Sequence, residues 1–144
     1  MRAFGLDVGT RTVGVALSDP LGITAQTLTT LRRTGLRADL AALRQLAETH
    51  EVTHAVVGLP LNMDGSEGAS AARSRAFGEA LGRALDVPVE YWDERLSTVA
   101  ANRALRETDA SPQRRREMVD QVAAALILQG WLDARRPTAP GEAE

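Results

Sequence analysis

Three acidic residues occupy positions at which apolar residues would be expected. Asp7 lies inside the apolar run of residues 3–8, and Glu94 ends the strand-like segment of residues 87–94. Asp120, placed on a helix, shares one side with apolar residues three, four, seven and eleven positions further along. A carboxylate in such surroundings is costly to bury unless a metal ion or hydrogen-bond donors hold it. The three acids are therefore the first candidates for catalysis.

Each of these acids also has an ordinary structural explanation. Asp7 could cap the turn that follows its strand, Glu94 could end a strand in solvent, and Asp120 could be favoured by a helix N-terminus. Strand alternation lets only one of Asp93 and Glu94 face a cleft shared with Asp7, and we choose Glu94. The residues alone leave these alternatives open.

Brought together, the three carboxylates would repel one another strongly unless divalent cations lay between them. A ligand set made only of oxygen selects magnesium or manganese over zinc. Two such ions, about 4 Å apart, would activate a water molecule and stabilise both the attacking and the leaving oxygen of a phosphodiester. The acids therefore predict metal-dependent hydrolysis of a nucleic-acid backbone.

Several polar residues near these acids are candidates for contact with the substrate. The turn after Asp7 offers backbone N–H groups to an anion, the turn-rich loop of residues 58–68 could hold a phosphate or a base, and the three arginines at 114–116 precede Asp120 by about one helical turn. The arginines are equally typical of a solvated helix face. The residues that we expect to contact substrate are Thr10, Arg11, Asn62, Arg95, Arg115 and Arg116.

Hydrophobic periodicity predicts the elements that position these residues. Strands are expected at 3–8, 13–17 and 23–31, the third at a sheet edge, then a helix at 38–49 and a strand at 54–58. A helix at 69–85, a strand at 87–92 and helices at 97–107 and 113–135 follow. Three antiparallel strands followed by alternating strands and helices predict an α/β fold with a five-stranded mixed sheet and helices on both faces. This is the ribonuclease-H-like order, in one domain over residues 1–136, with residues 137–144 as a disordered tail.

Composition narrows the class of protein. The 144 residues and a 44% hydrophobic content suit one domain with a full core, and the absence of cysteine excludes disulfides and a thiol nucleophile. No apolar run is long enough to span a membrane, so a cytoplasmic protein without a membrane partner is expected. The net charge of −2 means that nucleic acid must be bound through local patches or bridging metal ions.

Four motifs together resemble the YqgF family, also called RuvX. They are GLDVGTRTVGVA at 5–16, VGLPLNMDGS at 57–66, DERLST at 93–98 and VDQVAAALILQ at 119–129, and the resemblance extends over about residues 1–133. It implies a ribonuclease-H-like fold related to the RuvC Holliday junction resolvases, and a cytoplasmic bacterial nuclease that matures the 5′ end of the small-subunit ribosomal RNA precursor. It also implies that Asp7, Glu94 and Asp120 are the metal-binding acids. The positions just after Asp120 carry Gln121, Ala123 and Ala124 and no fourth carboxylate, which leaves the number of metal ions open.

Two other classes of function remain as alternatives. The segment LDVGT at 6–10 also resembles the phosphate-binding turn of sugar kinases, actins and heat-shock ATPases, so a nucleotide phosphotransferase is one alternative. Those proteins close two such domains over a nucleotide, and 144 residues supply only one unless a homodimer forms. A non-catalytic module that binds RNA or protein is the second alternative. The sequence does not separate precursor ribosomal RNA from branched DNA as substrate, because metal ions contact only the phosphates. A homodimer is a further hypothesis, since symmetric cutting of two strands needs two sites.

Overall fold

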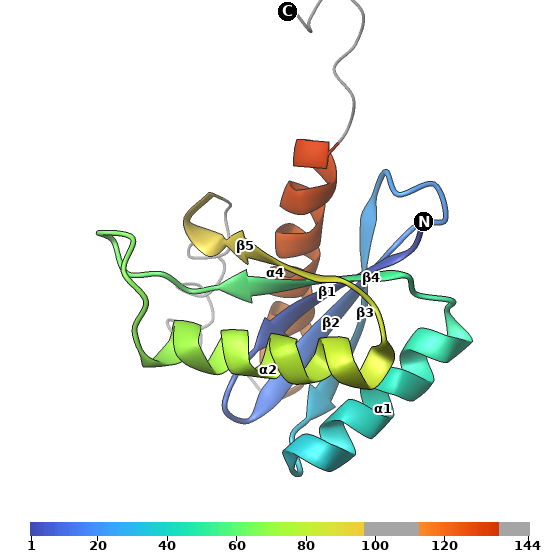
Figure 1. The fold of residues 1–144 in the computed structure, drawn as a ribbon, viewed down its shortest axis with the longest axis horizontal. Coiled ribbons are helices and arrows are strands. Elements are labelled where there is room, and N and C mark those ends of the chain that lie inside the picture. The colour runs from blue at the N-terminus through green and yellow to red at the C-terminus, as the bar shows by residue number, and fades with distance from the viewer. Residues whose placement is uncertain (97–112, 136–144) are drawn as a thin grey trace, which may run out of the picture.

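The computed structural model of the chain describes residues 1–96 and 113–135. One mixed sheet carries helices on both of its faces (Figure 1). In chain order the elements are β1 (Ala3–Val8), β2 (Thr12–Ser18), β3 (Ala25–Arg32), α1 (Leu36–Thr49), β4 (His54–Leu59), α2 (Ala69–Leu85), β5 (Val89–Asp93), the 3₁₀ turn η1 (Glu94–Leu96) and α4 (Gln113–Arg135). The helix expected at 97–107 and the tail at 137–144 lie outside the described residues.

The strands lie in the order β3-β2-β1-β4-β5. Antiparallel pairing joins β1 to β2 and β2 to β3, whereas β4 pairs parallel to both β1 and β5. This arrangement confirms the five-stranded mixed sheet with three antiparallel strands first. Because β1, β4 and β5 are parallel, their carboxyl ends meet at one edge of the sheet, where Asp7, the loop after β4 and Glu94 lie.

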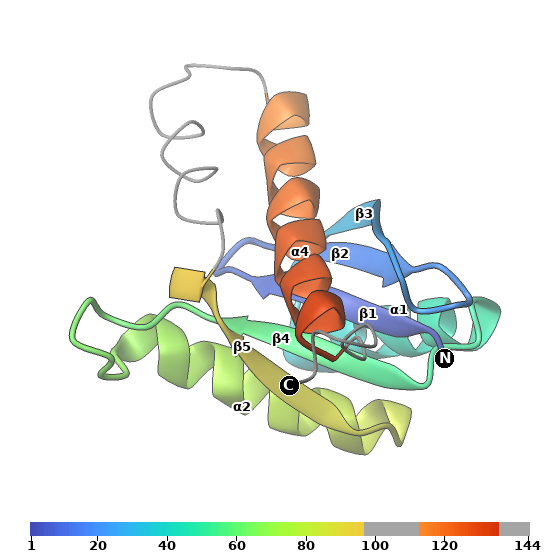
Figure 2. The same ribbon diagram turned by 90° about the horizontal axis from the view of Figure 1, so that it is seen from above.

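Two apolar layers hold the helices against the sheet. One layer joins the sheet to α1 and α2 through residues such as Leu6, Leu43 and Phe77. The other joins the opposite face to α4 through residues such as Val56, Ile127 and Leu128. Figure 2 shows α4 crossing the sheet on the side away from α1 and α2. The predicted placement of helices on both faces is therefore confirmed, as is the apolar stripe of α4 that follows Asp120.

Two strands begin later than the sequence predicts. The β3 strand starts at Ala25 instead of residue 23, because the N–H groups of Ile23 and Thr24 donate to Asp19 Oδ1 at 2.7 and 2.9 Å and close a turn. The β5 strand starts at Val89 instead of residue 87, since Pro88 has no N–H to donate. Among the described residues, no helix combines the length and the hydrophobicity needed to cross a membrane.

Candidate functional site

Asp7 and Asp120 both lie next to Gly14 of the neighbouring strand β2. In the β1–β2 register Asp7 lies directly opposite Gly14, so both residues face the same side of the sheet. That side carries α4: a Cβ on Gly14 would lie 2.5 Å from the carbonyl carbon of Asp120 and would overlap its carbonyl oxygen. Only glycine allows the helix backbone to come so close. The close approach places Asp120 beside Asp7.

A second glycine makes room for Glu94. Gly58 lies on β4, which pairs with β1 on one side and β5 on the other. A Cβ on Gly58 would lie 2.8 Å from Oε1 of Glu94 and 2.5 Å from Cδ1 of Ile127. The Glu94 carboxylate thus extends from the end of β5 over β4, on the face covered by α4. All three acids, Asp7, Glu94 and Asp120, are buried, with between 5 and 6% of their surface exposed. The structure therefore places the three predicted acids on one face and on one edge of the sheet.

Thr12 connects the first hairpin to α4, and the sequence analysis did not single it out. Its hydroxyl donates to Oδ2 of Asp120 at 2.8 Å, across 108 residues of sequence. Thr12 lies two residues before Gly14 on β2, so strand alternation puts it on the face of α4. That alternation is the signal that could have found it, although the choice of partner depends on how α4 docks. The hydrogen bond fixes the orientation of the Asp120 carboxylate.

A partly buried ion pair supports the turn that follows Asp7. Nε of Arg33 lies 3.1 Å from Oδ2 of Asp39, a residue with 1% of its surface exposed, and Nη1 donates to the carbonyl oxygen of Gly9 at 3.0 Å. The guanidinium also lies 5.1 Å from the centre of the Phe77 ring. Arg33 and Asp39 were not predicted from the sequence, because their contacts are set by the packing of α1 and α2. Thr10, a predicted substrate contact, lies exposed in the turn that they support.

Arg11 is the other predicted substrate contact in this turn. Its side chain is exposed, and its carbonyl oxygen accepts a hydrogen bond from the N–H of Arg33 at 2.8 Å. The backbone of Arg115 and Arg116 lies in the first turns of α4, but their side chains are outside the described part of the structure. Contact of these three arginines with substrate stays a prediction.

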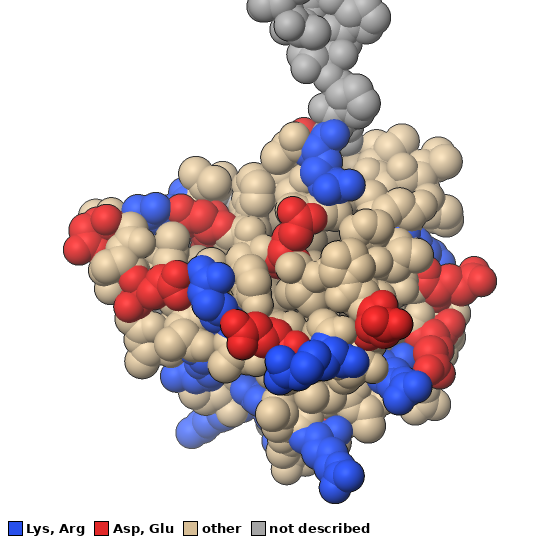
Figure 3. Space-filling model, in the orientation of Figure 1, with Lys and Arg blue, Asp and Glu red and all other residues tan. Residues whose placement is uncertain are grey.

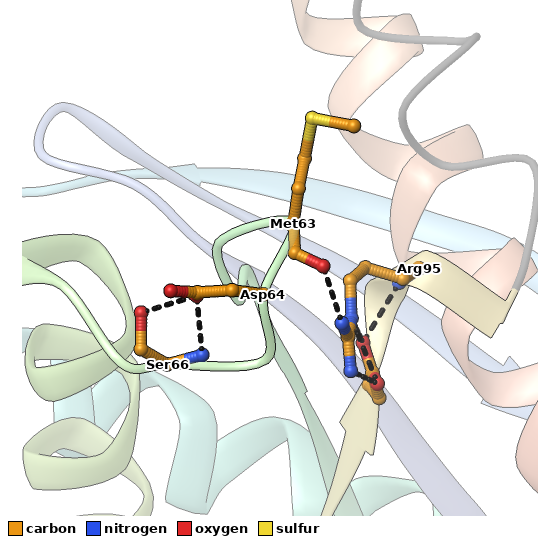
Figure 4. Close-up of polar contacts among 5 residues, drawn as sticks. Met63, Asp64, Ser66 and Arg95 are labelled. Atoms are coloured by element: carbon orange, nitrogen blue, oxygen red, sulfur yellow. Dashed lines mark hydrogen bonds and ion pairs between the residues drawn. The ribbon is translucent and has the colours of Figure 1, made fainter.

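Arg95 connects the loop after β4 to the end of β5. Its guanidinium pairs with Asp93 at 2.7 Å and donates to the carbonyl oxygen of Met63 at 3.1 Å (Figure 4). The hydrogen bonds from Arg95 lower the pKa of Asp93 below its ordinary value, and Asp93 in turn raises the pKa of Arg95. Asn62 donates from Nδ2 to Oγ of Ser66 at 3.0 Å. Both predicted substrate contacts, Asn62 and Arg95, thus also stabilise this loop.

The donor set at the site suits a hard divalent cation, since it consists of three carboxylates. Their convergence is incomplete: among the described residues, no group of three His, Cys, Asp or Glu side chains is placed so that it could hold one metal ion. The acids instead lie in a row on one face of the sheet, with Asp120 of α4 against Gly14 of β2, Asp7 on β1, and Glu94 of η1 against Gly58 of β4. On the face that α1 and α2 cover, acidic and basic side chains are intermixed (Figure 3), as suits a surface without a strong field of one sign.

Comparison with known proteins gives a consistent result. A family model described as "RuvX: Holliday junction resolvase" matches residues 1–134. A Myxococcus xanthus protein named "Putative pre-16S rRNA nuclease" is 66% identical over 137 residues, covering 95% of this chain and 91% of that protein. A Moorella thermoacetica protein of the same name is 59% identical over 133 residues, covering 92% of this chain and 95% of its own length.

A solved structure shares the fold. The Thermus thermophilus RuvC in complex with a Holliday junction substrate matches with a TM-score of 0.58 at 16% identity, covering 94% of this chain and 95% of that chain. The free RuvC of the same organism matches with the same TM-score at 14% identity, covering 94% of this chain and 96% of that chain. At these identities the likeness supports the ribonuclease-H-like fold alone.

Proposed function

The chain belongs to the RuvX family, and we propose that it is a nuclease that hydrolyses phosphodiester bonds of nucleic acid with divalent cations bound by Asp7, Glu94 and Asp120. One observation carries the assignment of these residues. Three buried carboxylates lie on the same face of the sheet. At Gly14 and Gly58, a residue larger than glycine would collide with Asp120 and Glu94, respectively. A structural role would require no such alignment.

The same acids would hold magnesium or manganese, which have the preference for carboxylate oxygen that this donor set requires. When bound, such ions supply an activated water and stabilise the charge of the attacking and leaving oxygens. Because the acids lie in a row over neighbouring strands, we propose that each cation is shared by adjacent carboxylates. Asp7 is central in the row and would contribute to every such pair.

The other residues of the site act on orientation. Thr12 donates to Oδ2 of Asp120 and thereby orients this carboxylate. Arg33 and Asp39 hold the turn that carries Thr10 and Arg11, whose exposed side chains would meet phosphates of the substrate. The backbone and side chains of this chain thereby position the substrate against the carboxylates.

We propose that the substrate is precursor 16S ribosomal RNA, which the names of the two relatives state, and that the cut is made at its 5′ end. Branched DNA is the second candidate, and it is favoured by the description of the family. Either substrate is compatible with action in the cytoplasm.

The test compares three proteins: wild type, the double variant Asp7→Asn with Asp120→Asn, and the control Glu48→Gln, which changes an exposed acid on α1. Each is incubated with magnesium or manganese and with labelled precursor RNA ends and four-way junctions. We expect wild type and the control to cut one of the two substrates and the double variant to cut neither. If neither substrate is cut with either metal while wild type still binds RNA, the nuclease proposal fails in favour of a non-catalytic binding module.

A further inference from the structure

Met63 is the most exposed of the large hydrophobic side chains that the structure describes. It is 97% exposed, compared with 78% for Leu21, which is next. A single exposed methionine is ordinary on a protein surface. What sets Met63 apart is the loop that presents it, which is both tightly hydrogen-bonded and attached to the strand end that carries Glu94.

The loop has a defined shape because its polar groups bond to one another. The N–H of Asn62 donates to the carbonyl oxygen of Ser66, and the N–H of Gly65 donates to that of Asn62, both at 2.9 Å. Oδ1 of Asp64 accepts from the N–H of Ser66 at 2.9 Å and from its hydroxyl at 2.6 Å. Gly65 has a φ of +87°, a conformation that suits glycine. The residues on both sides of Met63 are therefore held in place.

Two arginines anchor the loop to the rest of the fold. Arg95 donates to the carbonyl oxygen of Met63 at 3.1 Å while it pairs with Asp93. At the other end, Nη2 of Arg75 on α2 lies 2.7 Å from Oε2 of Glu67. Figure 4 shows the Met63 side chain extending away from Arg95, Asp64 and Ser66. The loop thus holds the methionine outward instead of folding it down onto the protein.

The loop is unsuited to binding phosphate. The N–H groups of Asn62, Gly65 and Ser66 already donate within the loop, so they do not form a cradle for an anion. Of the two ligands that the sequence suggests for this loop, a phosphate or a base, these contacts favour the base.

We propose that Met63 packs against the face of an unstacked nucleobase next to the scissile phosphodiester, so that the protein prefers nucleic acid whose base stacking is interrupted. This inference rests on the proposed nuclease function and deepens it. In a continuous duplex the base faces are covered by their neighbours, whereas a strand end or a branch point exposes them. A flexible thioether side chain adapts to such a flat apolar surface, and methionine is among the residues that proteins insert between bases.

The test measures binding separately from cleavage. Probes carry the fluorescent base 2-aminopurine at the branch point of a four-way DNA junction, or at the unpaired base beside an RNA duplex end, with continuous DNA and RNA duplexes as references. Wild type, Met63→Ala, Met63→Leu and the control Leu21→Ala are titrated in calcium, and a denaturing gel verifies that each probe is intact. Because Met63 and Leu21 are exposed, we expect the variants to fold like wild type, which thermal melting checks.

We expect wild type to bind the interrupted probes more tightly than the duplexes and to increase the fluorescence of 2-aminopurine. Met63→Ala should lose roughly tenfold in affinity for at least one interrupted probe, about the lower end of what one base-stacking contact contributes. Met63→Leu and Leu21→Ala should retain the wild-type affinity. The probe that Met63→Ala binds more weakly shows whether RNA or DNA supplies the base. Equal binding of both probe types by wild type, or an equal loss on both by Met63→Ala, overturns the inference. Cleavage in magnesium or manganese decides the nuclease proposal independently.

Discussion

Replacing Gly14 by alanine tests whether α4 rests on the first hairpin as the structure shows. The added Cβ would lie 2.5 Å from the carbonyl carbon of Asp120, and backbone atoms of a packed helix cannot rotate away. Overpacking of this kind costs about 1–3 kcal/mol, and alanine recovers about 0.4–1 kcal/mol by restricting the unfolded chain. Because the obstacle is backbone, we expect a net loss near the upper end, about 2 kcal/mol. For a chain of this length that lowers the melting temperature by roughly 4–8 °C.

Thermal and urea unfolding of Gly14→Ala would be compared with those of Gly82→Ala. In Gly82→Ala the new Cβ inside α2 would lie 3.1 Å from Cγ2 of Val89, which need shift only slightly, and 3.5 Å from the carbonyl oxygen of Val87, while alanine favours a helix by about 1 kcal/mol. We therefore expect Gly82→Ala to unfold at or above the wild-type midpoint. If Gly14→Ala unfolds with it, the helix backbone does not lie on Gly14, and the placement of Asp120 beside Asp7 is wrong.

Three further predictions address the supports of the site. Thr12→Val removes the hydrogen-bond donor to Asp120 and should raise the manganese concentration needed for half-maximal binding by about tenfold in calorimetry. Thr12→Ser keeps a hydroxyl and should bind manganese like wild type. Equal titrations of Thr12→Val and wild type would contradict the role of the hydroxyl. Arg33→Met leaves the buried Asp39 without its ion pair and should destabilise the chain by about 3 kcal/mol in urea unfolding, whereas a loss within error would show that the pair is dispensable. The hydroxyl and N–H of Ser66 lower the pKa of Asp64, so this carboxylate stabilises the loop above its ordinary pKa of 3.8, and the effect is lost as pH falls through the lower folded value. The amide shift of Ser66 in NMR should therefore titrate with a midpoint below 3.8, and a midpoint at or above it would refute the contact.

The fold follows from the sequence because periodicity reports which face of each element is buried. Strand β1 alternates between the two apolar layers, with Leu6 against α1 and α2 and Asp7 on the side of α4. The stripe of α4 is equally direct, since the residues predicted to share a side with Asp120 are all buried. The differences lie at the ends of elements: a local hydrogen bond such as that of Asp19 competes with strand pairing, and α1 begins at Leu36 instead of residue 38.

The supports of the site depend on contacts that no local pattern reports. Thr12 and Asp120 lie 108 residues apart, and their hydrogen bond exists only because α4 docks on Gly14. The ion pair of Arg33 with Asp39 likewise looks like two surface residues in the sequence, although Asp39 has 1% of its surface exposed. The residues that carry the chemistry are therefore easier to predict from the sequence than the residues that orient them.

The two glycines explain how the three carboxylates can lie on one face of the sheet. Asp120 on α4 and Glu94 after β5 each need space over a neighbouring strand, and a side chain at position 14 or 58 would fill that space. Glycine at Gly14 admits the helix that brings Asp120, and glycine at Gly58 admits the carboxylate of Glu94. Replacing an acid by its amide removes charge and leaves this geometry, whereas replacing either glycine changes the geometry and leaves the charge. The two kinds of variant thus separate the chemistry of the site from the packing that positions it.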